Sequence, residues 1–144
     1  MRISDVLQSK GSAEVATIRP DATVRELLTE LATHNVGALV VSEDGTSAIG
    51  IVSERDVVRH LNDDDAILDG PVSAIMTTSI RVGEPDDSLD RLMSLMTEHR
   101  VRHVPVVKDG QLVGIVSIGD AVKQRLSQLE FERDQLNKYV AGAQ

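Results

Sequence analysis

The spacing of hydrophobic residues changes its period along the first third of the chain. Between residues 23 and 34 the apolar positions recur every three or four residues, and Thr23 precedes them as a candidate N-cap. Residues 38–41 and 49–52 are short runs rich in β-branched residues, with an Asp-Gly pair between them. This pattern predicts a helix followed by a β-hairpin, and a second helix is expected to begin near Glu54.

The same order of elements occurs again about 65 residues later. Residues 20–45 and 85–110 are identical at eight of 26 positions, and residues 49–58 and 113–122 at six of ten. A helix is therefore expected at residues 88–99, strands at 103–107 and 112–116, and a second helix from Ile118. With short strands around residues 15–18 and 80–82, each copy reads as strand, helix, strand, strand, helix.

The repetition also sets the expected domain organisation. A short helix-like stretch precedes each copy, at residues 3–7 and 72–76, and the polar run Asn62-Asp63-Asp64-Asp65 reads as part of a surface linker. We divide the chain into a first repeat at residues 1–66, a second repeat at 67–126 and a C-terminal helical extension at 127–144. The expected fold class is α/β, of the α+β type, with the two repeats related by a pseudo-twofold axis.

The extension has a hydrophobic stripe of its own. Val122, Leu126, Leu129, Leu136 and Val140 follow a four-three spacing, with a charged residue in the one missing position. This spacing resembles three heptads broken once, and it favours a contact between two copies of the chain. A helix packed on its own domain is the alternative.

Composition narrows the classes of protein that the chain can belong to. Its 144 residues carry a net charge of −8, with no cysteine or tryptophan, one tyrosine and one phenylalanine. The lack of cysteine excludes disulfides, thiolate zinc sites and thiol nucleophiles. Acidity and scarce aromatic rings argue against nucleic acid as a partner. With no signal-like or membrane-length apolar segment, we expect a cytoplasmic protein without a membrane partner.

Several segments, in the same order in both copies, resemble the tandem cystathionine β-synthase (CBS) domains of a Bateman module. The resemblance covers roughly residues 3–126. Its motifs are Pro20-Asp21-x-Thr23-Val24, Gly50-Ile51-Val52-Ser53-x-x-Asp56, Ile75-Met76-Thr77, Pro85-Asp86-x-Ser88-Leu89, Arg102-His103-Val104-Pro105-Val106-Val107 and Gly114-Ile115-Val116-Ser117-x-x-Asp120.

The resemblance implies a regulatory module without catalytic activity. Members of this family bind adenine nucleotides in the cleft between the repeats, so we expect AMP as the ligand, with ADP or ATP, NAD(H) or S-adenosylmethionine as alternatives. Many act as energy or redox sensors, which implies signal transduction to a partner protein that the sequence does not identify. Bateman modules also pair into disc-like dimers, which implies a homodimer here.

By the same resemblance, Asp56 and Asp120 bind ribose, while Ser53 and Ser117 lie beside ribose or phosphate. The motif suits such a role, because a serine at a helix start can share a phosphate with the first-turn N–H groups. An ionised aspartate only accepts hydrogen bonds and so matches the ribose hydroxyls. Helix capping alone is the alternative explanation of a serine followed three residues later by an acid.

The two copies differ where the ligand is expected. The first hairpin strand opens with small residues and the second with donor groups, and the first motif carries an arginine that the second lacks. The candidate nucleotide-binding residues at these positions are Gly37, Ala38, Arg55, Arg100, Arg102, His103 and Pro105. Cationic side chains here could reach phosphate, so we predict two non-equivalent sites. Solvated charges, or ion pairs with neighbours such as Asp56, are the alternative for Arg55 and Arg100.

Metal binding and catalysis have little support in the sequence. His99 and His103 are four residues apart, but helix gives way to strand between them and fewer than three ligands are visible, so we expect no metal site. No phosphate loop, dinucleotide fingerprint or nucleophile elbow occurs. The open alternatives are an interaction and dimerisation module without bound nucleotide, and a nucleotide hydrolase.

Overall fold

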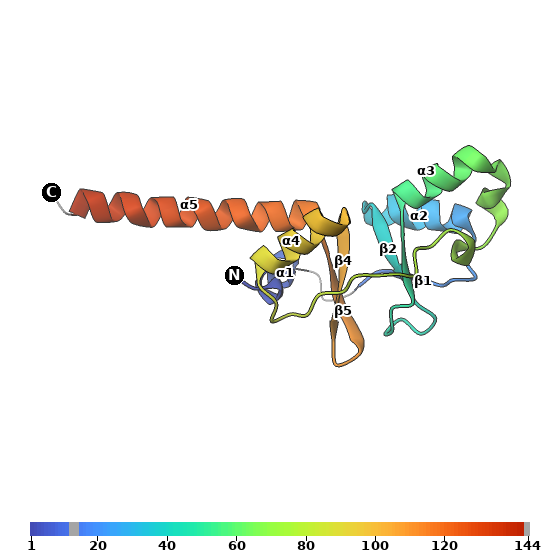
Figure 1. Ribbon diagram of the computed structural model, residues 1–144, viewed down its shortest axis with the longest axis horizontal. Helices are drawn as coiled ribbons and strands as arrows, with labels where there is room; N and C mark the ends of the chain where they lie inside the picture. The colour runs from blue at the N-terminus through green and yellow to red at the C-terminus, as the bar shows by residue number, and fades with distance from the viewer. Residues whose placement is uncertain (12–14, 143–144) are drawn as a thin grey trace.

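Two small sheets stand side by side in the computed structural model, which describes residues 1–11 and 15–142 (Figure 1). The first sheet has the order β1 (Thr17–Ile18), β2 (Ala38–Val41), β3 (Gly50–Ser53). Its β1 and β2 are parallel, and β2 and β3 are antiparallel. The second sheet is the antiparallel hairpin of β4 (His103–Lys108) and β5 (Gln111–Ser117). The fold is therefore the α/β pair of repeats that the sequence pattern predicts.

Helices cover both sheets at the positions that the hydrophobic spacing indicates. The first repeat contributes α2 (Val24–His34) and α3 (Glu54–Asp63), followed by the 3-10 turns η1 (Asp65–Asp69) and η2 (Val72–Ala74). Thr23 begins α2 with a capping box, because its hydroxyl accepts from the Glu26 N–H at 3.1 Å and the Glu26 carboxylate accepts from the Thr23 N–H at 3.2 Å. The second repeat contributes α4 (Leu89–His99) and α5 (Ile118–Gly142).

The strand expected at residues 80–82 is not formed. Instead the chain makes a single parallel bridge from Gly83 to Val106 on β4. The Gly83 N–H donates to the Pro105 carbonyl, and the Val107 N–H donates to the Gly83 carbonyl, both at 2.9 Å. Pro85 follows two residues later and has no N–H to donate, so the ladder ends there.

Each repeat has its own hydrophobic core, but the segments that precede the repeats are exchanged. The helix α1 (Ile3–Lys10) buries Ile3 and Val6 in the core of the second repeat. In the same way, Val72 and Ile75, which precede the second repeat, lie in the core of the first. The packing therefore crosses the division that we made at residues 66 and 67.

The helix α5 extends far beyond the rest of the molecule (Figure 1). Ala121 is its one buried residue within the described part of the chain. Leu126, Leu129, Leu136 and Val140 are each at least half exposed. The alternative that this stripe packs on its own domain is therefore wrong. No helix in residues 1–11 and 15–142 is long and apolar enough to cross a membrane.

Candidate functional site

A cavity of about 560 Å³ opens between the two repeats. One wall comes from the first repeat, where β3 ends and α3 begins, and includes Ser53 and Asp56. The other wall is the segment of the second repeat that joins α4 to β4, with Arg100 and His103. The expected residues Gly37, Ser53, Arg55, Asp56, Arg100, Arg102 and His103 all line this cavity.

Ser53 and Asp56 are linked by reciprocal hydrogen bonds at the start of α3. Asp56 Oδ2 accepts from the Ser53 N–H at 2.9 Å, and Ser53 Oγ accepts from the Asp56 N–H at 3.3 Å. The capping arrangement is thus present. It uses one carboxylate oxygen, while Oδ1 meets only the Thr77 hydroxyl, at the long distance of 3.4 Å. A carboxylate oxygen has two acceptor sites, so Asp56 can cap the helix and still accept from a ligand hydroxyl.

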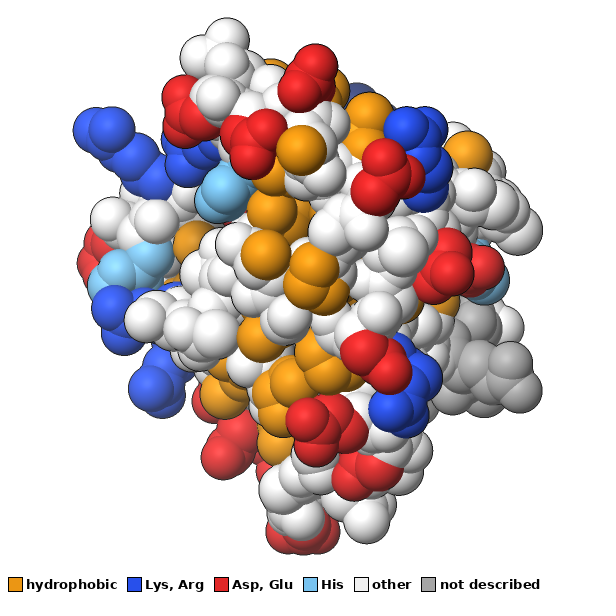
Figure 2. All heavy atoms as spheres, turned by 90° about the vertical axis from the view of Figure 1, so that its right-hand side faces the viewer, with side chains coloured by type: hydrophobic (Ala, Val, Ile, Leu, Met, Phe, Trp, Pro, Cys, Tyr) orange, Lys and Arg blue, Asp and Glu red, His pale blue; other side chains and the backbone are white. Residues whose placement is uncertain are grey.

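Four arginines surround the cavity: Arg55, Arg59, Arg100 and Arg102. In residues 1–11 and 15–142, none of them forms an ion pair within 4.0 Å. The expected alternative of a bond to Asp56 is therefore not seen. Figure 2 shows the end of the molecule formed by the first repeat, with Lys, Arg and His side chains mainly along the left edge of that view. The cavity concentrates positive charge in a chain whose net charge is −8.

His103 lines the cavity beside these arginines. Burial lowers the pKa of its imidazole, and the carboxylates of Asp120 and Glu54 only partly oppose this effect. The ring lies against Gly37, where a Cβ atom would come within 3.5 Å of it. The lowered pKa favours the neutral imidazole, so the arginines supply most of the positive charge of the cavity.

The apolar part of the lining is aliphatic. Ile51, Val58 and Val101 face the cavity, and the two aromatic residues of the chain both lie on α5, outside it. A flat ring bound here would lie between branched aliphatic side chains. This surface can bury a base by the hydrophobic effect without aromatic stacking.

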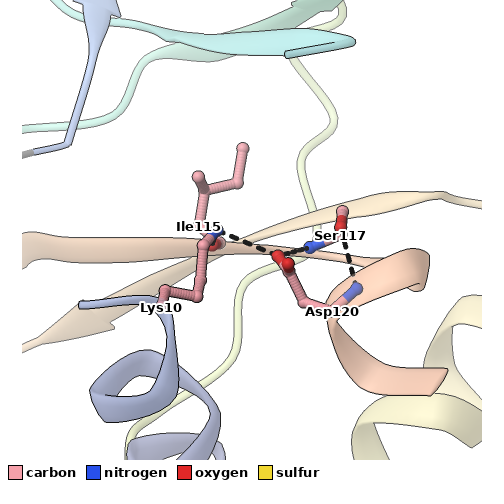
Figure 3. Close-up of polar contacts among 4 residues, drawn as sticks. All are labelled: Lys10, Ile115, Ser117 and Asp120. Carbon is pink, nitrogen blue, oxygen red and sulfur yellow. Dashed lines mark hydrogen bonds and ion pairs between the residues drawn. The ribbon is translucent and has the colours of Figure 1, made fainter. Parts of the chain in front are cut away.

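The equivalent residues of the second repeat lie elsewhere. The Asp120 N–H donates to Ser117 Oγ at 3.1 Å, and Asp120 Oδ2 accepts from the Ser117 N–H at 2.9 Å and pairs with Lys10 Nζ at 2.9 Å (Figure 3). Burial pushes the pKa of Asp120 upward, but the hydrogen bonds from Ser117 and Lys10 outweigh it and leave the pKa below its usual value. The structure thus places the two aspartates in different surroundings.

Two other expected residues lie outside the 560 Å³ cavity. Ala38 lines a smaller cavity of about 240 Å³ at the other end of the cleft. Pro105 is buried in β4, where it pairs with Ile115 on β5. Successive side chains of a strand point to opposite faces, so Pro105 faces away from Val104 and Val106, which pack in the second core.

Sequence reasoning missed three polar residues of the cavity lining: Glu54, Arg59 and Thr77. Arg59 had a usable signal, because it follows Arg55 by four residues and so shares its helix face. Thr77 had none, because it reaches the cavity through backbone pairing with Ile51, a residue far away in the sequence. No group of three His, Cys, Asp or Glu side chains suited to a metal occurs in the part of the chain that the structure describes.

The comparisons with known proteins agree with this architecture. The family model for the CBS domain matches residues 3–63 and 72–127. A CBS domain-containing protein of Arabidopsis thaliana, CBSX3, named as mitochondrial, is 38% identical over 97% of this chain and 72% of its own length. The crystal structure of the CBS-domain protein ATU1752 from Agrobacterium tumefaciens is 38% identical and covers 87% of this chain and 99% of its own, with a TM-score of 0.82.

A second structural relative carries a ligand. It is the CBS domain protein PAE2072 from Pyrobaculum aerophilum complexed with AMP, and it is 35% identical to this chain. The similarity covers 83% of this chain and 89% of the relative, with a TM-score of 0.71.

Proposed function

The chain belongs to the CBS-domain family, and from that premise we propose that its 560 Å³ cavity binds an adenine nucleotide, AMP in the first place. The protein would act as a regulatory module rather than an enzyme, with ATP, NAD(H) or S-adenosylmethionine as further candidates. The observation that carries the proposal is the set of four arginines beside Asp56 and an aliphatic wall, which form no ion pair among the residues that the structure describes. The relative that is complexed with AMP supports the choice of ligand.

Each part of a nucleotide has a chemical counterpart in this lining. Asp56 Oδ1 would accept hydrogen bonds from the ribose hydroxyls. Arg100 and Arg102 would bind phosphate, since a guanidinium forms paired, charge-assisted hydrogen bonds with phosphate oxygens. Ile51 and Val101 would contact the base. Because these groups come from both repeats, a bound nucleotide would stabilise one relative position of the repeats that a partner protein could recognise.

Calorimetric titration with AMP, ATP, NADH and S-adenosylmethionine tests the proposal. We expect Asp56→Asn to weaken binding of the preferred compound at least tenfold, since hydrogen bonds to a charged group contribute about 1.5–3 kcal/mol. Asp63→Asn is the matched control, because this aspartate lies at the far end of the same helix and outside the cavity lining. Absence of binding heat with every adenine compound would contradict the proposal, and phosphate release sensitive to Asp56→Asn would favour a hydrolase.

We further propose that α5 pairs with the α5 of a second copy, because its apolar stripe is exposed and helices in proteins gain most of their stability by packing such a face. In heptad terms Leu126, Arg133 and Val140 occupy a positions, with Leu129 and Leu136 at d positions. An antiparallel pair that aligns the stripe would bring Glu132 beside its counterpart. We propose the parallel pair, which separates the two Glu132 side chains and instead brings Arg133 beside its counterpart at an a position.

Cysteine cross-linking tests the pairing, because the chain has no cysteine of its own. In a parallel pair Val140 faces its counterpart, so Val140→Cys should form a disulfide-linked dimer under mild oxidation. Lys138→Cys, on the outer side of the helix, is the control and should remain mostly monomeric on a non-reducing gel. Equal cross-linking of the two variants, or a monomer by sedimentation, would contradict it.

A cytoplasmic location and control of an unidentified partner protein remain proposals. The composition favours a cytoplasmic location, whereas the Arabidopsis thaliana relative is named as mitochondrial. If nucleotides leave the melting temperature unchanged while a bound partner is lost on removal of residues 127–144, the chain would be an interaction module with empty clefts. Affinity capture from its own host with the intact and shortened chains, with and without AMP, separates these functions.

A further inference from the structure

In the first repeat, Thr77 meets two acceptors at the end of β3. Its N–H donates to the carbonyl of Ile51 at 2.9 Å, and its hydroxyl faces Asp56 Oδ1 at 3.4 Å. The first is a backbone pairing, and the second is a long contact from an uncharged donor. The Asp56 carboxylate therefore has no cation bonded to it in the part of the chain that the structure describes.

The equivalent acceptors of the second repeat, 64 residues later, are both bonded to a lysine. Lys10 Nζ donates to the Ile115 carbonyl at 2.7 Å and pairs with Asp120 Oδ2 at 2.9 Å (Figure 3). Lys10 comes from the C-terminal end of α1, whose Ile3 and Val6 pack in the core of the second repeat. The exchange of the preceding segments thus brings a charged ammonium to the place where the first repeat has a threonine.

Lys10 also divides the space at this end of the cleft. It lines the aliphatic cavity of about 240 Å³ that contains Ala38 and Val36, and it lines a neighbouring cavity of about 270 Å³ that contains Asp120. Each is about half the volume of the cavity at the first end. The aliphatic surface and the carboxylate are therefore in separate cavities that share Lys10 as a wall.

We propose that Lys10 keeps the second end of the cleft closed to adenine nucleosides and so limits the chain to one tightly bound nucleotide. This inference rests on the proposed function of the first end. A ribose bound at the second end needs the Asp120 carboxylate, which Lys10 already holds. Release of Lys10 would free that carboxylate and join the two cavities into one space similar in size to the first.

The strength of the Lys10 contacts supports this role. The side chains of Lys10 and Asp120 are only 31% and 26% exposed, so water screens their attraction less than on an open surface. Both Lys10 bonds are charge-assisted, and charge-assisted bonds are about twice as strong as neutral ones. A ribose hydroxyl could donate to Asp120 but carries no charge, so displacement of Lys10 by a nucleoside would lose the ion pair and the charged donor to the Ile115 carbonyl.

Binding stoichiometry provides the test, with AMP and adenosine as the probes. By calorimetry and native mass spectrometry we expect the wild-type chain to bind one AMP, and Lys10→Ala to bind two. The second end should bind adenosine roughly tenfold or more tightly in Lys10→Ala than in the wild-type chain, because the Lys10 ammonium no longer competes for Asp120. Lys10→Arg keeps a cation on Asp120 and should stay at one. Lys123→Ala should also stay at one, because this residue lines the 270 Å³ cavity without contacting Asp120.

Two double variants locate the new site. Asp56→Asn with Lys10→Ala should retain only the second end, and Asp120→Asn with Lys10→Ala should return to one AMP per chain. If wild type binds one AMP and Lys10→Ala also binds one, the inference is overturned while the proposed function stands. If no variant binds any adenine compound, both fail, and circular dichroism of each variant distinguishes this result from unfolding.

Discussion

Arg100 has an unusual backbone conformation and a guanidinium in the nucleotide cavity. Its φ of 54° lies in the left-handed region, as does the φ of 52° at Asn35, which ends α2 as Arg100 ends α4. Asparagine adopts this conformation more readily than arginine does. Arg100 thus ends its helix in a conformation that suits asparagine better, and its side chain lines the cavity.

This contrast defines a substitution that separates binding from folding. Arg100→Asn should leave the free energy of unfolding unchanged or raise it by a few tenths of a kcal/mol, because the variant copies the helix end of the first repeat. The dissociation constant for AMP should rise by about tenfold through loss of a charge-assisted bond. Thermal melting and calorimetry measure the two effects, with the exposed Arg81→Asn as control, and unchanged affinity would remove Arg100 from the site.

His103 predicts a dependence of stability on pH. Its folded-state pKa lies below the ordinary value of 6.5, so between these two values the unfolded chain binds more protons than the folded chain. Stability should therefore fall as the pH drops from 6.5 toward the lowered pKa. In His103→Gln the melting temperature should decline less over this range, whereas His99→Gln, an exposed control on α4, should behave like wild type.

At the scale of elements, a capping box decides where α2 begins. The Thr23 capping box holds the start of α2, whose Val24, Leu27 and Leu31 are buried in the first core. Thr23→Ala should lower the free energy of unfolding by about 1 kcal/mol, because the Glu26 N–H at the helix start loses the Thr23 hydroxyl that accepts from it. Thr29→Ala, later in the same helix, is the control in urea unfolding, and equal losses would contradict a capping role.

The helix α5 contains one charged residue in its stripe, and this residue gives a test of pairing through a gain of stability. In a parallel pair Arg133 would face its counterpart at an a position, which costs stability. Arg133→Leu should therefore raise the melting temperature and make the dimer persist at lower protein concentration. Lys138→Leu, outside the stripe, should not. A helix that stays unpaired would show neither concentration dependence nor stabilisation.

At the scale of the whole molecule, the exchanged segments join the two repeats. The first core includes Val72 and Ile75, which come after the division at residue 66, while α1 belongs to the second core. A fragment of residues 1–66 should therefore fail to fold, because it lacks part of its core and exposes α1. The equally long fragment 15–80 contains the complete first core and should retain more structure. Circular dichroism with urea unfolding compares them, and equal stability would contradict the exchange.

The predictable parts of the site were those that depend on short stretches of chain. Ser53 and Asp56 form a helix-start motif within four residues, and the arginine at residue 55 lies inside it. Thr77 and Lys10 could not be assigned, because each reaches its acceptors through packing between segments that are far apart in the sequence. Pro105 lies outside the lining of the 560 Å³ cavity, because the motif is visible in the sequence but the burial of β4 is not.

By itself the sequence determined the duplicated order of helices and strands, the aliphatic core and the family. These features depend on hydrophobic spacing and on motifs whose residues are close together in the chain. Only the tertiary structure decided that the segments preceding the repeats are exchanged, that the ion-pair-free arginines gather at one end of the cleft, and that Lys10 holds Asp120 at the other. The physical reason is that these features depend on how the two repeats pack. Two copies of nearly the same pattern can therefore form two chemically different sites.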